Sequence, residues 1–311
     1  MHLLIPFASA LSEAAVHMLR DLPLPRLQKL LTLLAPTARC GDDEYTLTPP
    51  HERALADALG LHGEDGRLPW AARQARLDGL AVGDQAWGLL TPVHWAVGRD
   101  QVTLLDPAAL NLSEAESREH LEAIRQLFES EGFTLAYGAP TRWYAAHASL
   151  AALPTASLDR VIGRNVDLWL AARSESRLVR RLQNEVQMLL YQHPAHDERT
   201  ARGALPVNSF WLSGCGRAQP DAPAGEPPVV DDRLRAPLLA GDWAAWAEAW
   251  QALDAERIAP LLAKAQRGEA VALTLCGERC AQRFEPAPRS LWQRLTGAGR
   301  GEPPHAVLEA L

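Results

Sequence analysis

Lysine is nearly missing from this chain of 311 residues, which holds only Lys29 and Lys264 among its 31 basic side chains. A Schiff-base enzyme and a P-loop nucleotide site both depend on a lysine, so this scarcity argues against both. Acidic residues outnumber basic ones, 38 against 31, and the formal net charge is −7. Bulk nucleic acids and anionic membranes attract a surplus of basic residues. The sequence therefore predicts neither as a partner.

Long apolar runs and cysteine are also scarce. The sequence has no run of about 18 apolar residues, so it predicts no membrane-spanning helix. Its first 15 residues lack the basic segment with which a secretory signal peptide begins. Four cysteines are too few for a disulfide scaffold in a chain of this length. Together these features predict a cytoplasmic protein.

The hydrophobic pattern predicts a mixed α/β (α+β) fold, because stretches with helical spacing alternate with short apolar runs typical of strands. The expected helices are 11–22, 24–35, 48–59, 113–130, 176–193 and 242–265. The expected strands are 2–7, 86–97, 101–106, 133–138, 142–147, 206–213, 270–277 and 279–286. Ser113 and Glu116 form a capping box at the start of one helix, and Pro194 is expected to end another.

From residue 86 to residue 193 the order of elements is β-β-α-β-β-α. One small four-stranded sheet with two helices on one face satisfies this order, within a larger sheet-and-helix globule. Four segments follow one another along the chain. They are an N-terminal strand with helices (1–85), the sheet-and-helix region (86–216), a Pro-, Ala- and Asp-rich linker or exposed loop (217–232), and a C-terminal region of helix and hairpin (233–311).

The stretch LPVNSFWLSGCG (205–216) is an apolar strand that runs into a loop of small residues. Backbone N–H groups of a glycine turn can bind an anion, and arginine can hold phosphate with two parallel hydrogen bonds. The stretch is therefore a candidate anion site, and the alternative is an ordinary strand end with solvated arginines. The candidate residues are Arg199, Arg202, Ser209, Ser213, Gly214 and Gly216, with Asn208, Arg164 and Asn165 as further donors.

Cys215 lies between two glycines and is a candidate nucleophile. A nucleophilic cysteine needs a base or a lowered pKa, and His193 and His196 are the available bases. The alternative is a small buried thiol without chemical function.

Two clusters contain residue types that bind metals. The segment 193–197 holds two histidines and an aspartate, but its proline separates them and favours a helix stop. Cys276 and Cys280 are four residues apart, with no further ligands at the spacing of a zinc site. The sequence therefore predicts no metal site in either place.

Two helix surfaces are open to more than one interpretation. An arginine cluster near the start of the helix at 176–193 could meet a phosphorylated ligand or form a solvated, self-paired surface; it consists of Arg173, Arg177, Arg180 and Arg181. A tryptophan stripe on the helix at 242–265 fits a buried core or a groove for a protein partner; it consists of Trp243, Trp246 and Trp250.

The segment HPAHDERTARGALPVNSFWLSGCG (193–216) resembles the cofactor-independent phosphoglycerate mutases of the archaeal type. The resemblance extends weakly back to residue 86, where that family has an inserted sheet-and-helix domain. The matching positions are His193, Pro194, Arg199, Gly203, Pro206, Asn208, Trp211, Gly214 and Gly216, and His196 stands where the family has asparagine.

Most of the chain also resembles the RpfE-type regulatory proteins of proteobacteria. This resemblance is carried by RNVDLW (164–169), RRLQNEVQMLLYQHP (180–194), RGALPVNSFWLSGCG (202–216) and LTLCGE (273–278). It implies a bacterial cytoplasmic protein with a regulatory role.

The chain departs from the mutases in the residues that would carry catalysis. The family resemblance implies two divalent metals, held by an early Asp, an Asp-x-x-x-His pair and a late Asp-His pair, and a Ser or Thr nucleophile. Here the first strand is followed by PFASA, which contains no Asp. The late part of the chain has no Asp-His pair, and its only histidine is His305. The adjacent acidic residues 42–44 suit a solvated loop.

These observations lead to three functional hypotheses. The first is a non-catalytic or regulatory phosphoglycerate mutase-like protein that binds a phosphorylated small molecule and needs no cofactor. The second is a phosphotransfer enzyme, a mutase or phosphatase, with rearranged ligands for divalent metals. The third is a protein-interaction module that uses the tryptophan stripe.

Overall fold

The structure, a computed structural model, describes residues 1–41, 43–170, 176–220, 226–286 and 302–311. The chain divides into two compact units. Unit 1 comprises Met1–Glu44, Pro49–Gly60 and Ala222–Leu311, and unit 2 comprises Tyr45–Thr48 and Leu61–Asp221. Unit 1 combines the first and last parts of the chain, whereas the segments expected from the sequence followed chain order.

Unit 1 is built on a five-stranded sheet with the order β2-β11-β10-β1-β9. The interior strand β1 (His2–Ile5) pairs in parallel with the central strand β10 (Ala272–Cys276) and with the two-residue edge strand β9 (Val229–Val230). β10 and β11 (Ala281–Pro286) form the antiparallel hairpin expected near the C-terminal end, and β11 pairs with β2 (Leu34–Cys40).

One expected helix of unit 1 is too long. The segment 24–35 has helical spacing, but α2 (Pro25–Leu31) ends at Leu31 and β2 begins at Leu34. A short apolar run fits a helix and a strand equally well, and the antiparallel pairing with β11 decides the outcome at residue 34. The other helices among the described residues of unit 1 are α1 (Glu13–Asp21), α3 (Pro50–Leu59), α9 (Arg235–Ala240), α10 (Trp243–Leu253), η5 (Asp254–Ile258), α11 (Ala259–Gln266) and α13 (Pro304–Glu309).

The tryptophan stripe belongs to the core of unit 1. Trp246 and Trp250 on α10 have no exposed surface, and Trp243 packs against the same hydrophobic cluster. The Trp246 indole N–H donates to the Phe7 carbonyl at 3.1 Å. Side chains without exposed surface cannot contact a partner, so the burial of Trp246 and Trp250 favours the core interpretation of this stripe.

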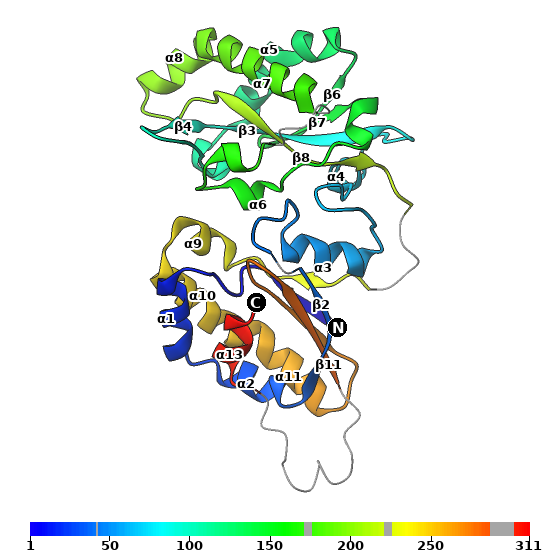
Figure 1. Cartoon of the computed structure of the whole chain (residues 1–311), viewed down its shortest axis with the longest axis vertical. Helices are drawn as coiled ribbons and strands as arrows, with labels where there is room; N and C mark the ends of the chain where they lie inside the picture. The colour runs from blue at the N-terminus through cyan, green and yellow to red at the C-terminus, as the bar shows by residue number, and fades with distance from the viewer. Residues whose placement is uncertain (42, 171–175, 221–225, 287–301) are drawn as a thin grey trace, which may run out of the picture. The chain divides into compact units, whose positions relative to one another are not determined.

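Unit 2 contains the expected four-stranded sheet, which is antiparallel with the order β6-β7-β3-β8. Helices α5 (Glu114–Ser130) and α7 (Arg177–Gln192) cover one face, and α4 (Trp70–Leu77) covers the other (Figure 1). The mixed α/β fold class is therefore confirmed. The strands are β3 (Ala86–Val93), β6 (Thr134–Ala139), β7 (Arg142–Ala146) and β8 (Ser209–Arg217).

The fourth strand of this sheet differs from the one that the element order suggested. β4 (Trp95–Val97) and β5 (Val102–Leu104) form a separate hairpin, and β8 takes the edge position beside β3. The Asn208 side chain explains the departure, because it accepts the Trp95 N–H at 2.8 Å and donates to the Trp95 carbonyl at 3.0 Å. These bonds hold the chain where it leaves β3.

The junction at Pro194 both ends one helix and begins another. α7 ends at Gln192 as expected, and α8 (Pro194–Ala201) starts with proline in its first turn, where a missing N–H costs nothing. The His193 ring caps α8 by accepting the Ala195 N–H at 3.3 Å. Where unit 2 is described, its remaining helical turns are η1 (Pro107–Leu110), η2 (Ala148–Ala151), α6 (Leu158–Val161) and η3 (Val166–Leu168).

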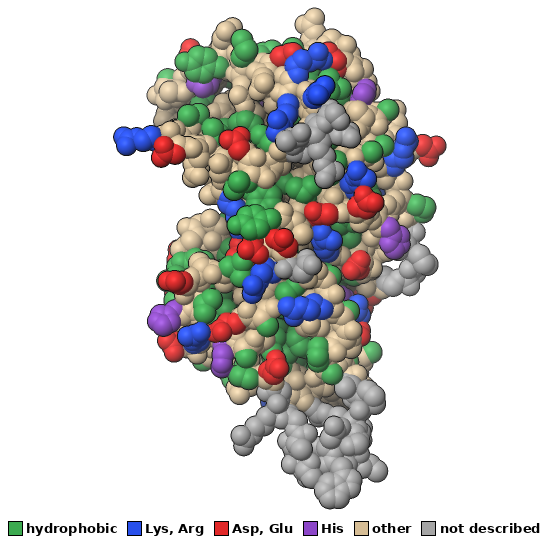
Figure 2. Space-filling view, viewed as in Figure 1, with side chains coloured by type: hydrophobic (Ala, Val, Ile, Leu, Met, Phe, Trp, Pro, Cys, Tyr) green, Lys and Arg blue, Asp and Glu red, His purple; other side chains and the backbone are tan. Residues whose placement is uncertain are grey.

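The helices and surface charge agree with the composition. Within the described ranges, no helix combines the length and the apolar character needed to cross a membrane. On the face shown in Figure 2, basic and acidic side chains are interspersed and do not gather in a patch of one sign.

Candidate functional site

Arg199, the buried arginine of the motif, serves the architecture of unit 2. Its side chain is 2% exposed. Nη1 donates to Glu116 Oε1 at 2.7 Å, Nε donates to the Leu205 carbonyl at 2.8 Å, and Nη2 donates to the Leu110 carbonyl. Arg202 donates to the same Glu116 oxygen from the surface. The two arginines therefore tie α8 to the start of α5.

Glu116 is the centre of this network. Its Oε2 accepts the Ser113 N–H at 3.0 Å and the Ser113 hydroxyl at 2.7 Å, which completes the expected capping box. Burial acts to raise the pKa of Glu116, but the Ser113 hydrogen bonds and the charges of Arg202 and Arg199 outweigh it. They lower the pKa from 4.5 to about 2, so Glu116 is ionised at neutral pH.

The stability of the protein is expected to fall as the pH decreases from about 5 to about 2, because Glu116 takes up a proton. When folding lowers the pKa of a carboxyl group, the ionised group stabilises the folded protein at any pH above the pKa of the unfolded state. This stabilisation is lost as the pH falls from there through the pKa of the folded state. The shift from 4.5 to about 2 corresponds to about 3 kcal/mol. Urea unfolding of the wild type and Glu116→Gln between pH 7 and pH 3 tests this, and the variant should show the flatter pH profile.

The expected loop of small residues is instead part of β8, which continues through residues 213–216 to Arg217 in the ladder with β3. Gly214 has φ +63°, and a Cβ there would lie 3.0 Å from the Ala71 nitrogen, while Gly216 lies against Pro69. These glycines therefore bring the strand close to the start of α4. Ser209 and Gly216 are about 23 Å apart along the strand, at a rise of about 3.3 Å per residue.

The structure does not bring the predicted anion-site residues together. Arg199 and Arg202 bind Glu116 on the helical face that holds α5 and α8, whereas Gly214 approaches the start of α4. The remaining candidates have separate local contacts. Ser209 accepts from Gln187 at 3.5 Å, Asn208 binds Trp95, Asn165 caps η3, and the Arg164 guanidinium lies 5.9 Å from the Trp169 ring centre.

The Cys215 thiol is buried within unit 2. It is 1% exposed, and burial raises its pKa to about 12, while the neighbouring Thr155 acts in the opposite direction. A thiol of this pKa is protonated at neutral pH and is a poor nucleophile. The geometry therefore favours the interpretation of Cys215 as a buried thiol.

We expect a thiol reagent at pH 8 to label Cys40 in the native protein and to leave Cys215 unmodified. Cys40 is partly exposed, whereas Cys215, Cys276 and Cys280 are buried. Peptide mass spectrometry after brief alkylation measures both sites, and the same reaction in urea is the control for reactivity. Rapid native labelling of Cys215 would contradict its burial and its raised pKa.

The two metal-ligand candidates from the sequence have other roles. His193 is occupied as the cap of α8. Cys276 and Cys280 belong to different hydrophobic clusters, one with Leu4 and the other with Leu3 and Ile5. Because neighbouring residues of a strand point to opposite faces, these cysteines lie on opposite faces of the sheet.

A two-metal centre of the mutase type does not fit the residues at the carboxyl end of β1. The chain there continues as Pro6, Phe7 and Ala8, without a carboxylate. Asp231, which follows β9, accepts hydrogen bonds from Arg233 and Arg257 at 2.8 to 2.9 Å. Across the part of the chain that the structure describes, no group of three His, Cys, Asp or Glu residues is placed to hold a metal ion.

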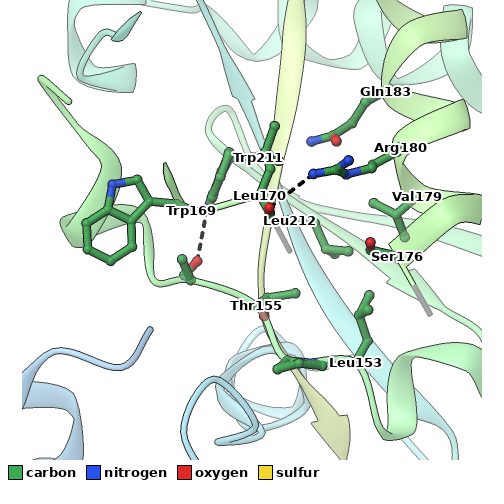
Figure 3. Close-up of a pocket in the computed structure, with 12 residues that line it drawn as sticks. Leu153, Thr155, Trp169, Leu170, Ser176, Val179, Arg180, Gln183, Trp211 and Leu212 are labelled. Atoms are coloured by element: carbon green, nitrogen blue, oxygen red, sulfur yellow. Dashed lines mark hydrogen bonds between the residues drawn. The ribbon is translucent and has the colours of Figure 1, made fainter. Parts of the chain in front are cut away.

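A pocket that the sequence did not predict lies between α7, β8 and the loop 153–156 in unit 2 (Figure 3). The space bounded by these segments amounts to about 380 Å³ only when the open solvent at its mouth is counted, and the enclosed part is much smaller. The mainly apolar lining comes from segments far apart in the sequence, among them Leu153, Trp169, Leu170, Val179, Trp211 and Leu212. A concave apolar pocket with a few polar groups is the usual form of a small-molecule site.

Polar groups reach the pocket from α7. Figure 3 shows the side chains of Arg180 and Gln183 extending from this helix toward β8. Arg180 Nη2 donates to the Leu170 carbonyl at 3.0 Å, and the buried Gln183 amide donates to the Phe210 carbonyl at 3.4 Å. Arg180 belongs to the predicted arginine cluster, whose member Arg181 instead pairs with Glu131 at 2.5 Å and Glu185 at 3.7 Å. Arg173 lies outside the described residues.

Comparison with known proteins finds no matching family model. The chain is 28% identical over 169 residues to a protein from Geobacter sulfurreducens described as a probable 2,3-bisphosphoglycerate-independent phosphoglycerate mutase. The match covers 51% of this chain and 41% of that protein, so the chain matches less than half the length of this relative.

Two solved structures show weaker likeness. A cofactor-independent phosphoglycerate mutase from Thermoplasma acidophilum aligns with 91% of this chain and 89% of its own, at 14% identity and a TM-score of 0.36. The PH0037 protein from Pyrococcus horikoshii aligns with 92% and 87%, at 13% identity and a TM-score of 0.43. The sequence match to the Geobacter protein indicates common ancestry. Over about half of its own length, this chain is homologous to a cofactor-independent phosphoglycerate mutase.

Proposed function

We propose that this chain is a non-catalytic, regulatory relative of the phosphoglycerate mutases, of the RpfE type, which binds a small phosphorylated molecule in a bacterial cytoplasm. The observation that carries this proposal is the pocket beside β8, with an arginine from α7 at its edge. Arginine is well suited to phosphate because its planar guanidinium can donate two hydrogen bonds to it.

The groups that would be needed for catalysis in the motif have structural roles. Arg199 and Arg202 are bound to Glu116, and Cys215 is buried with a raised pKa. Ser213 is 6% exposed, which suits a packed strand better than a nucleophile that must meet a substrate. These contacts argue against group transfer by these residues, and the proposed binding site is the pocket beside β8, which neither arginine lines.

A thermal-shift panel with 3-phosphoglycerate, phosphoenolpyruvate, nucleotides and inorganic phosphate, each with and without Mn²⁺, tests the proposal. A ligand at 100 times its dissociation constant adds about 2.7 kcal/mol, which moves the unfolding midpoint by several degrees. The shift should be lost in Arg180→Gln and kept in Arg177→Gln, the matched control on the same helix. A flat panel on folded protein would overturn the proposal.

A turnover assay distinguishes a phosphotransfer enzyme from the non-catalytic protein proposed above. Release of phosphate or interconversion of phosphoglycerates with Mn²⁺, lost in Ser213→Ala, would replace the regulatory proposal with a mutase or phosphatase that has rearranged metal ligands. Elemental analysis of the purified protein gives a second reading, because such an enzyme should hold two metal ions per chain.

A further inference from the structure

A cavity in unit 1 offers a second place for a small molecule. It measures about 270 Å³, and about 710 Å³ when the open solvent at its mouth is counted. We infer that this cavity binds an unbranched aliphatic carboxylate of about eight carbons, with the chain against α2, β11 and α13 and the carboxylate at Arg39. This site is independent of the proposed function, because its described lining residues all belong to unit 1.

The walls of the cavity require an apolar ligand body. Leu31 comes from α2, Leu34 begins β2 and Val307 comes from α13, and all three are buried. Phe284 on β11 adds an aromatic side chain to the same lining. A sugar phosphate would leave its hydroxyl groups without partners against these side chains, which costs free energy. A methylene chain would instead exchange water for aliphatic contacts.

A β-bulge in β2 brings Arg39 to the face of the sheet that these walls cover. Arg39 lies opposite Gln282 on β11. Pro36 lies opposite Phe284, and the register shifts between the two pairs. Opposite residues of an antiparallel pair share a face, and so do residues two apart on one strand, so Arg39 and Pro36 share the face of Phe284. A regular strand would point Arg39 to the other face, and re-aiming a side chain in this way is a known role of bulges.

Arg39 supplies the positive charge for the carboxylate. Its Nη2 donates to the Ala310 carbonyl at 2.6 Å and to the Cys280 sulfur at 2.7 Å, which fixes the guanidinium. Among the described residues it makes no other hydrogen bond, so Nε and Nη1 keep N–H donors for an oxyanion. Glu302, which also lines the cavity, precedes α13, whereas Ala310 follows this helix. The acidic group is therefore at the end of α13 away from Arg39, and its repulsion favours the carboxylate at Arg39.

The volume of the cavity sets the length of the chain. An apolar cavity of about 150 Å³ holds one benzene molecule. By proportion, the cavity of about 270 Å³ holds about ten non-hydrogen atoms, which is the number in octanoate. A chain suits this space better than a ring, because the lining follows β2 from Leu34 to Arg39.

Isothermal titration of the full chain with octanoate, octanol and acetate tests the inference, because octanol lacks the charge and acetate lacks the chain. We expect octanoate to bind about tenfold more tightly than octanol, and Arg39→Gln to weaken octanoate binding about tenfold, as expected for a lost charged hydrogen bond. Acetate should bind at least about a hundredfold more weakly than octanoate, since it lacks the methylene groups that the walls would bury. Arg283→Gln is the matched control, because Arg283 lies between Gln282 and Phe284 on β11 and so points to the opposite face.

Two further variants locate the binding. Val307→Phe, which fills the cavity, should abolish octanoate binding, and Arg180→Gln in unit 2 should leave it unchanged. Octanol that binds as tightly as octanoate would show that Arg39 does not hold the head group, and acetate that binds as tightly would show that the chain has no role. Either result overturns the inference, as does octanoate that fails to bind the folded wild type or still binds Val307→Phe. Because Arg39 is exposed, Arg39→Gln is expected to fold even if Val307→Phe does not, and circular dichroism checks both.

Discussion

Glu116→Gln is expected to lower the free energy of unfolding by about 3 kcal/mol at pH 7. The substitution keeps the shape of the side chain but removes the charge that faces Arg199, whose guanidinium is buried. A buried charge that loses its partner is strongly destabilising, because the protein interior cannot replace the lost solvation. The size agrees with the lowered pKa of Glu116, which reports the same interactions.

Urea unfolding followed by circular dichroism measures this loss, and hydrogen exchange of peptides from α5 and α8 locates it in unit 2. Glu114→Gln is the matched control, because Glu114 lies on the same helical turn and pairs with Arg118 on the surface. An exposed pair of this kind contributes about 0.5 kcal/mol or less. Equal effects of the two substitutions would show that the buried network does not stabilise the motif.

The capping box shows what local sequence can determine. Ser113 and Glu116 are three residues apart, and this spacing alone predicted the start of α5 correctly. The sequence could not show that Glu116 also binds Arg199 and Arg202, which are more than 80 residues away. An arginine that binds phosphate and an arginine that binds a buried glutamate look the same in a sequence. The anion site was therefore predicted from the right residue types, but those residues lie in separate places.

The sheet of unit 2 shows a second limit. The alternation of apolar and polar residues predicted a sheet of four strands. The sequence alone does not show whether β5 or β8 pairs with β3. The Asn208 amide binds the backbone of Trp95, 113 residues away, and such a long-range contact is not visible in the sequence. The pocket has the same origin, because its walls come from a loop, a helix and a strand that meet only after folding. Several of its residues lie in motifs that the sequence singled out, among them Trp169, Gln183 and Leu212, but nothing in the sequence indicated that they line one pocket.

Trp246→Ala is expected to destabilise unit 1 by about 3 to 5 kcal/mol, the range for truncating a large buried aromatic side chain. Trp246 has no exposed surface and packs edge to face with Trp243 and Trp250, at ring-centre distances of 6.0 and 6.4 Å. Alanine would leave a cavity and would also remove the hydrogen bond to the Phe7 carbonyl. Urea unfolding with hydrogen exchange of peptides from α10 measures the effect.

Trp243→Ala is the control for this substitution, because Trp243 lies on the same helix but is only partly buried. It should cost clearly less, since it removes less buried apolar area. A docking surface makes the opposite prediction: Trp246→Ala would leave unfolding unchanged and would weaken only a complex with a partner. Burial therefore turns the tryptophan stripe from evidence for a partner into a stability determinant. The two substitutions decide between these roles without any knowledge of what the protein binds.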